Sequence, residues 1–530
     1  MPVITYDDFA GGLDVRPAAA LSRTNILRVL QNAYVTTGKA IRKRPCLFKE
    51  ATLEAGTVGL KSFNGKLNTF YGDGAAITHA DTRFVARRVP HWLTGVAPTK
   101  IHYADQYNAQ LYVAAEYSGP VYRHHYLDDP GAWVTATAYT VGLFRRPTTA
   151  NGFRYEVTAI LGTGTSGGVE PVWPLTVGAT VIDNAGANQI TWTCRTFAVT
   201  DTNCPHSKQV AKQASKIYAV GVDLTTVRFC KTGDPRDWTT ASDAGFIPAG
   251  LNARGSDQVT AINLYSNKSL AVFFSDNAQL WAADPNPANI SLTSNIEGVG
   301  TLHHRAAGPV SLDLYFLAQN GYRSLSFTTL TNNLQDSDVG SPIDKIIKAQ
   351  ILSTDDALAI YYPKLGQFWS INGSTVWAFT FSRTAKISAW SKFTFPFSVD
   401  DACVLNQELY VRTGNDVYRV SDTTYKDGVS SIPLVDMQMF YQDGKKPGVL
   451  KQFTGMDVIG EGQWTISHRF AADNETLETE AYEYPAITEP GAMYPVELLS
   501  TRIGPHLQHQ KDEPAELSSL MLYYESLGPV

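Results

Sequence analysis

The stretch Leu409-Tyr410-Val411-Arg412-Thr413-Gly414-Asn415-Asp416-Val417-Tyr418-Arg419-Val420 decides the fold of this chain. It contains a short apolar segment, a turn rich in Gly, Asn and Asp, and a second apolar segment, which is typical of a tight β-hairpin. Degenerate copies recur along the sequence. We expect the seven strand pairs at 67–71 with 76–78, 111–114 with 121–123, 217–220 with 227–229, 270–274 with 280–281, 314–317 with 322–325, 368–371 with 376–379, and 409–411 with 417–420.

The spacing of these pairs is close to regular. Their first strands begin 44, 106, 53, 44, 54 and 41 residues apart. Five of the six gaps suit one four-stranded propeller blade each, because such blades repeat every 40 to 50 residues or so. A β-sandwich is the alternative, but its hairpins need not recur at a fixed longer period. The sequence therefore predicts an all-β fold, with a β-propeller of about seven blades.

The one long gap indicates an inserted small β-module. Its excess length falls near residues 139–199, where Tyr155-Glu156-Val157-Thr158 and Ile190-Thr191-Trp192-Thr193-Cys194 are expected to be strands. After about Ser431 the blade pattern stops. We expect an N-terminal segment that packs on the propeller or closes its ring (1–50), first blades (51–137), the inserted module (138–202), remaining blades (203–430) and a separate C-terminal β-region (431–530).

Helix signals are scarce. The best candidate follows Ser341-Pro342, where Ser is a favourable cap, Pro suits the first helical position and Asp344 lies in the first turn. We expect about two helical turns that end before Ser353.

Composition excludes several classes of protein. With 44% hydrophobic and 18% charged residues, the chain is typical of globular proteins. A formal net charge of −6 argues against a protein whose main task is to bind nucleic acid by its phosphates, although a wall past which DNA slides remains compatible. No apolar run approaches the roughly 18 residues of a membrane span, and the first ten residues carry no secretory signal. We expect a soluble chain made in a cytoplasm.

Cysteine and histidine patterns favour structural roles. The five cysteines are scattered, so we expect buried thiols rather than a disulfide framework. Cys194, Cys204 and His206 lack a fourth partner at zinc-site spacing, so no metal site is expected. Neighbours on a strand face opposite sides, so the pairs His124-His125 and His303-His304 are expected to be surface or interface residues.

Catalytic motifs are missing. Gly162-Thr163-Gly164-Thr165-Ser166-Gly167 matches the dinucleotide-binding pattern, but Pro171 and Pro174 forbid the helix that this motif needs, so we expect a surface loop. The sequence has no nucleophile elbow, P-loop or zinc-protease motif, and no signature selects a pair of carboxylates. We expect a protein without enzymatic activity, catalytic residues or cofactors.

The most concentrated basic run comprises Lys39, Arg42, Lys43 and Arg44, which end at Pro45. One interpretation is a solvated edge strand, where charge and proline discourage unwanted pairing. The other is a contact with an acidic neighbouring subunit or with DNA in a channel. These four residues are the candidate interaction site.

Several segments, this run among them, resemble one family of viral proteins. They are Gly11-Gly12-Leu13-Asp14, Asn32-Ala33-Tyr34-Val35, residues 38–45, Leu280-Trp281, residues 289–292, Gly298-Val299-Gly300 and residues 317–325. Within the insertion, residues 167–174 resemble a small β-module that is common in phage tail proteins. Over residues 1–430 the chain resembles the tail nozzle proteins of short-tailed bacteriophages, also called tail tubular protein B or packaged-DNA stabilisation proteins. Cys46 departs from the family, which usually has Gly after the Arg-Pro pair.

The resemblance implies a ring, commonly of six copies, in the virion tail below the portal and adaptor. Such a ring extends the DNA channel, helps to retain the packaged genome and opens for ejection into the host. The implied partners are other copies of the chain, the tail adaptor protein and the passing genomic DNA, with a tail fibre or spike and the host cell envelope as further candidates and no stable membrane insertion. Alternatives are a carbohydrate-active or glycan-binding virion propeller, and a receptor-binding protein at the tail tip.

Overall fold

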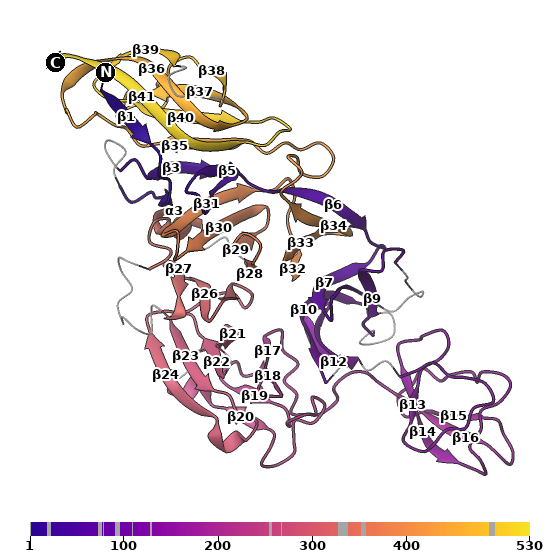
Figure 1. Ribbon diagram of the computed structural model, residues 1–530. Coiled ribbons are helices and arrows are strands. Elements are labelled where there is room, and N and C mark those ends of the chain that lie inside the picture. Colours follow the sequence, from indigo (N-terminus) through magenta and orange to yellow (C-terminus); the bar gives the residue numbers. More distant parts are fainter. Residues whose placement is uncertain are drawn as a thin grey trace. The chain divides into compact units, whose positions relative to one another are not determined.

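The computed structural model describes residues 2–529 apart from 18–22, 73–76, 78, 91–95, 109, 128–129, 254–256, 267, 327–337, 351–356 and 487–492 (Figure 1). The chain divides into two compact units, Leu53–Gly300 and Met1–Thr52 together with Thr301–Val530. Strands dominate both units, so the predicted all-β class is confirmed. No helix among the described residues is long and apolar enough to cross a membrane.

The Leu53–Gly300 unit contains four small sheets and the insertion. The first sheet is β7 (Thr57–Phe63), β8 (Lys66–Tyr71) and β9 (Phe84–Arg88), and the second is β10 (Pro98–Tyr107), β11 (Gln110–Tyr117) and β12 (Val121–Leu127). The third is β17 (Val210–Gln213), β18 (Lys216–Val220), β19 (Val227–Phe229) and β20 (Gly245–Ile247). The fourth is β21 (Ala261–Tyr265), β22 (Ser269–Phe273), β23 (Asn277–Ala282) and β24 (Ser291–Glu297).

The other unit contributes three more groups, in which each strand pairs antiparallel with the next along the chain. The first is β25 (Ala307–Val310), β26 (Asp313–Ala318) and β27 (Gly321–Ser324). The second is β28 (Leu358–Tyr362), β29 (Gln367–Asn372), β30 (Thr375–Ser382) and β31 (Ile387–Thr394). The third is β32 (Asp401–Leu405), β33 (Glu408–Thr413) and β34 (Asp416–Ser421), and the N-terminal strand β6 (Cys46–Thr52) completes it by pairing with β34.

All seven predicted first strands are confirmed, and each is the second strand of one of these seven groups. The burial of these strands on both faces explains why they could be predicted from the sequence. Along β11, Val113 belongs to a core shared with β7–β9, whereas its neighbours Tyr112 and Ala114 belong to a core shared with β17–β20. Along β18, Ile217 and Tyr218 likewise face different cores. Consecutive sheets therefore pack face to face inside this unit, and the second strands are apolar on both faces.

The predicted second strands are confirmed in six of the seven pairs. In the first pair, residues 76 and 78 lie outside the described residues, and Ile77 is not in a strand. Besides β7, β8 pairs with β9, and β9 runs parallel to β8. A parallel partner needs a longer connection than a hairpin, so the strand that follows the turn lies further along the chain than the hairpin pattern predicts.

The insertion forms a sheet of its own with the order β13-β14-β16-β15. Its strands are β13 (Phe144–Arg145), β14 (Arg154–Ile160), β15 (Thr180–Asp183) and β16 (Ile190–Arg195). Trp192 and Tyr155 centre its core, and Trp192 stacks edge-on against Tyr139. Residues 162–167 form a loop after β14, as predicted.

The last hundred residues share both of their sheets with the N-terminal segment. One sheet has the order β39 (Tyr494–Ser500), β36 (Val449–Glu461), β41 (Glu516–Pro529), β5 (Ile41–Lys43) and β4 (Ala33–Val35), and β1 (Val3–Tyr6) also pairs with β41. The other continues from β31 through β2 (Gly12–Leu13), β3 (Ile26–Gln31), β35 (Val435–Met439), β40 (Gly504–His509), β37 (Gln463–Arg469) and β38 (Tyr482–Pro485). The C-terminal region is thus not separate, because N-terminal strands complete it.

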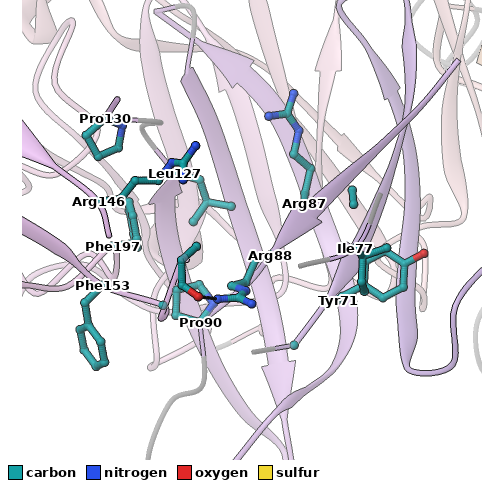
Figure 2. A pocket seen from close by; sticks show the side chains of 14 residues that line it. Tyr71, Ile77, Arg87, Arg88, Pro90, Leu127, Pro130, Arg146, Phe153 and Phe197 are labelled. Atoms are coloured by element: carbon teal, nitrogen blue, oxygen red, sulfur yellow. Dashed lines mark hydrogen bonds between the residues drawn. The ribbon is translucent and has the colours of Figure 1, made fainter. Parts of the chain in front are cut away.

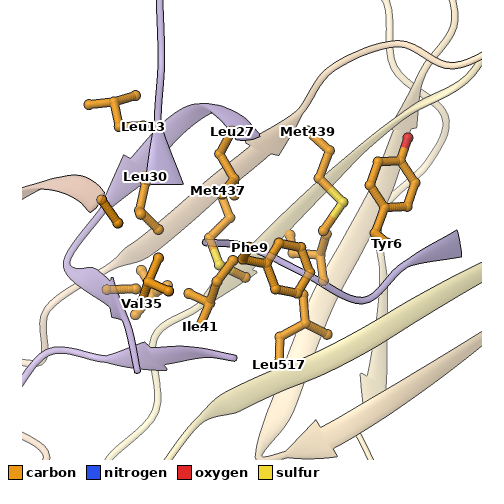
Figure 3. Close-up of a cluster of buried hydrophobic side chains, with 14 of the residues drawn as sticks. Tyr6, Phe9, Leu13, Leu27, Leu30, Val35, Ile41, Met437, Met439 and Leu517 are labelled. Carbon is orange, nitrogen blue, oxygen red and sulfur yellow. The ribbon is translucent and has the colours of Figure 1, made fainter. Parts of the chain in front are cut away.

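Apolar side chains explain this joining of the two chain ends. Tyr6 and Phe9 are fully buried, and Figure 3 shows Phe9 among Met437, Met439 and Leu517. Neither end could cover these side chains alone, and burial of each contributes roughly 1.5–3 kcal/mol.

Helices are short. They include α1 (Ala249–Asn252), the 3-10 turn Pro287–Asn289 (η1) and α3 (Asp344–Gln350). The predicted helix after Ser341-Pro342 is therefore confirmed, and Asp344 lies in its first turn. The Ser341 hydroxyl accepts a hydrogen bond from Arg16 at 3.3 Å.

We predict that Leu517→Ala lowers the free energy of unfolding of this unit by about 2–5 kcal/mol, because it leaves a cavity in the shared core. Leu527→Ala on the same strand is the matched control, since Leu527 is 57% exposed and Leu517 is 0% exposed. Its effect should stay within about 0.5 kcal/mol. Urea denaturation measures both, and equal losses would contradict the shared core.

Candidate functional site

The predicted basic site lies on an inner strand. Strand β5 carries Arg42 and Lys43 and runs between β4 and β41, so it is not the edge strand of one interpretation. Because strand neighbours face opposite sides, Arg42 points outward while Lys43 is buried. The four cations therefore do not share one surface.

Arg44 is an internal structural residue. Its side chain is 0% exposed and forms a two-pronged ion pair with Asp427, whose carboxylate also accepts the backbone N–H of Leu47 at 3.0 Å. The remaining guanidinium donors bind the side-chain oxygen of Asn32 at 3.0 Å and the carbonyl oxygen of Thr394 at 3.0 Å. Arg44 has no surface left to offer a partner.

Lys43 is also committed to internal contacts. Its ammonium group donates to the carbonyl oxygen of Lys511 at 2.6 Å. Burial, the largest cause, lowers the pKa of Lys43, because desolvation disfavours the charged form. Lys43 holds the segment before β41 rather than facing a partner.

Lys39 and Arg42 are the two cations of the run that reach solvent. The Lys39 ammonium lies 2.7 Å from the Asp8 carboxylate, and the Arg42 guanidinium donates to Glu516 at 2.6 Å. Exposed pairs of this kind are weak, at roughly 0–1 kcal/mol, so a partner could exchange them. Arg42 and Glu516 border a cavity of about 280 Å³ whose lining also includes Asp422, Glu461 and Tyr425. Its rim mixes both signs of charge and is not a simple anion site.

A second candidate site is a pocket of about 330 Å³ in the Leu53–Gly300 unit (Figure 2). Three arginines line it: Arg87 and Arg88 on β9, and Arg146 from the insertion. Phe153, Phe197, Pro90 and Pro130 supply most of the apolar wall. No local motif marks this site, because its arginines come from two distant segments.

Hydrogen bonds fix some of these arginines in place. Arg88 donates to the carbonyl oxygen of Ala150, and Arg87 donates to the side-chain oxygen of Asn68 at 2.8 Å. The buried hydroxyl of Tyr71, another lining residue, has no hydrogen-bond partner within the described ranges. Cationic groups beside aromatic rings suit a polar ligand that carries negative charge.

The histidine pair His124-His125 is fully buried, so the expectation of surface or interface residues is wrong for this pair. Burial is the main cause that lowers the pKa of each to about 3, and both are neutral at pH 7. Hydrogen bonds compensate for this burial. The Tyr112 hydroxyl lies 2.8 Å from His124 Nδ1, and the Tyr117 hydroxyl lies 2.8 Å from His125 Nε2. His303 and His304 are half-buried.

All five cysteines are buried free thiols, as predicted. Cys194 lies in the core of the insertion, and it does not join Cys204 and His206. Those two residues meet His124 instead, which sequence spacing did not reveal.

We predict that Arg44→Gln lowers the free energy of unfolding by about 3–5 kcal/mol, because it leaves the buried Asp427 carboxylate unpaired. Arg42→Gln is the matched control from the same run and should cost at most about 1 kcal/mol. Urea denaturation of the full chain measures both. A loss at Arg42 as large as that at Arg44 would contradict these assignments.

Comparison with known proteins adds little. No protein-family model matches the chain, and no curated protein matches it. Among solved structures, Hsv2 from Kluyvelomyces marxianus aligns with 56% of this chain and 97% of its own, at 7% sequence identity and a TM-score of 0.21. A likeness at that level supports no inference about fold or function.

Proposed function

We propose that this protein is a structural component of a short-tailed phage tail: a ring-forming nozzle that extends the DNA channel below portal and adaptor, helps to retain the packaged genome and opens for ejection. The observation that carries the proposal is the series of seven small sheets in the region where the sequence resembles tail nozzle proteins. The series accounts for the periodicity of the predicted strand pairs.

The proposed architecture of this region is a seven-bladed β-propeller. Within each unit, sheets that follow one another along the chain share cores; for example, Trp369 of β29 and Val411 of β33 pack in one cluster. Strand β6 completes the sheet of β32–β34 although it precedes it by more than 340 residues. A terminal strand in a late blade is how propellers close without a sheet edge.

The proposed partners are other copies of the chain and the tail adaptor protein, with DNA as a passing substrate. Because Lys43 and Arg44 are engaged internally, Lys39 and Arg42 are the cations of the run that remain for such contacts. A net charge of −6 suits weak contact with DNA, since conduction fails if the wall binds phosphates tightly.

We predict that the full chain, mixed with its adaptor, forms rings in negative-stain images. Lys39→Glu with Arg42→Glu should reduce the fraction of assembled particles several-fold, because the reversed charges would repel the acidic partner surface that the proposed contact requires. Lys364→Glu is the control, since Lys364 also forms exposed pairs, with Glu408 and Asp422. A chain that stays monomeric alone and with adaptor would count against the nozzle function.

A second candidate function, glycan binding, is favoured by the arginine-lined pocket. Aromatic rings and arginines form a suitable wall for a sugar that carries carboxylates. The pocket borders the insertion, which is where the sequence departs from the blade period.

If the protein binds glycans, Arg146→Gln should weaken its affinity for acidic host polysaccharide about tenfold, since a hydrogen bond to a charged group contributes about 1.5 kcal/mol or more. Arg83→Gln is the control, because Arg83 forms an exposed pair with Asp81 on the same unit. Glycan-array binding and calorimetry measure the effect. Wild-type protein that retains no polysaccharide would remove this candidate.

A further inference from the structure

One cysteine thiol and two histidine imidazoles lie close together inside the Leu53–Gly300 unit. His124 lies on β12, and Cys204 and His206 lie on the segment that returns from the insertion to β17. Their ligand atoms all lie within 4.8 Å of one another. His124 is 0% exposed and Cys204 is 4% exposed. The Cys204 sulfur is thus shielded from bulk solvent, which argues against a nucleophilic role for the thiol.

Hydrogen bonds define the tautomer of His124. Its Nε2 lies 2.7 Å from the carbonyl oxygen of Ser207, which can only accept, so Nε2 carries the proton. The Nδ1 lone pair therefore faces inward, 3.5 Å from the Cys204 sulfur. A metal-binding histidine usually donates its other N–H to a carbonyl or carboxylate in this way.

His206 presents its own Nδ1 to the same sulfur at 3.7 Å. That atom also accepts the backbone N–H of His124 at 3.4 Å, so it too carries a lone pair. His206 adopts φ = 49°, a left-handed conformation that is uncommon outside glycine, and this conformation follows directly after Pro205. Strained backbone of this kind is concentrated at ligand-binding positions.

The two sulfur–nitrogen separations match a tetrahedral metal site. With zinc–sulfur bonds of about 2.3 Å and zinc–nitrogen bonds of about 2.0–2.1 Å, a sulfur and a nitrogen on one tetrahedron are about 3.6 Å apart. The two sulfur–nitrogen distances here are 3.5 and 3.7 Å. We propose that Cys204, His124 and His206 bind one zinc-class divalent metal ion.

The chemistry of the three groups is compatible with this role. Burial is the main cause that lowers the pKa of His206 to about 4, so this imidazole, like that of His124, is a neutral ligand at pH 7. Burial raises the pKa of the Cys204 thiol to about 12, so the metal-free thiol keeps its proton. Binding forms a metal–sulfur bond and releases that proton to solvent.

Tyr112 contacts the cluster through its hydroxyl. Its hydroxyl donates to His124 Nδ1 at 2.8 Å, a contact that satisfies this nitrogen when no metal is bound. When the ion takes the lone pair, the phenolic oxygen is the adjacent donor for the fourth position. The site would then join β11, β12 and the segment after the insertion, which fixes the point where the chain re-enters the blade region. This inference does not depend on the proposed tail function.

The test uses the full chain, expressed without a metal-binding tag in zinc-supplemented medium. Elemental analysis should find about one zinc per chain, and Cys204→Ser and His206→Gln should each retain less than about a tenth of that. Cys194→Ser and His125→Gln are matched controls, because both replaced residues are buried outside the cluster, and they should keep the metal.

A titration of chelator-treated wild-type protein with Co²⁺ decides the matter if a variant fails to fold. We expect a thiolate-to-cobalt charge-transfer band that saturates at about one equivalent, and a melting temperature that rises when zinc is restored. Wild-type protein that binds no metal at micromolar zinc, a cobalt complex without the thiolate band, or equal loss in the control variants would overturn the proposal.

Discussion

The buried pair of Arg44 and Asp427 is the interaction on which the arrangement of the chain ends depends. Asp427 receives both prongs of the guanidinium and the N–H of Leu47, at the start of β6. Arg44 also contacts Asn32 and Thr394, the last residue of β31. One guanidinium thus joins the N-terminal segment, the sheet of β28–β31 and the chain after β34. Its desolvation is tolerable only because its donors find acceptors in all three places.

The sequence revealed the strands that are apolar on both faces, and for a physical reason. A second strand such as β11 or β18 has a neighbouring sheet on each side, so every residue must suit a core and the apolar signal is strong. The pairing of β1 and β5 with β41 leaves no such signal. It joins residues more than 470 positions apart, and register across that separation is set by side-chain packing rather than by a turn. Strand β9 was not predicted as a partner of β8, because a hairpin places the next strand directly after the turn, whereas β9 is parallel to β8 and lies further along the chain.

The sequence was sufficient to identify the basic residues of the candidate site, but not to predict which of them are exposed to solvent. A run of four cations is typical of a solvated face. The alternation of side chains along the strand turns Lys43 inward, however. Arg44 is buried against Asp427, which lies 383 residues away in the sequence. The same limit applies to the metal cluster. Cys204 and His206 are close in the sequence, but His124 lies 80 residues before Cys204, and nothing in the sequence predicts that β12 brings it to them.

Several residues on which the proposed resemblance to tail nozzle proteins rests have internal roles. A Cβ on Gly12 would lie 2.7 Å from the Cβ of Ala389, and a Cβ on Gly321 would lie 2.0 Å from the Asp344 carboxylate. Arg323, two residues later, pairs with Asp344 at 2.8 Å and so attaches β27 to α3. Such positions tolerate little change because the fold needs them. Residues 38–45 carry the resemblance too, and there Lys39 and Arg42 form exposed ion pairs. We therefore expect the residues that select a partner at such exposed positions and around the insertion.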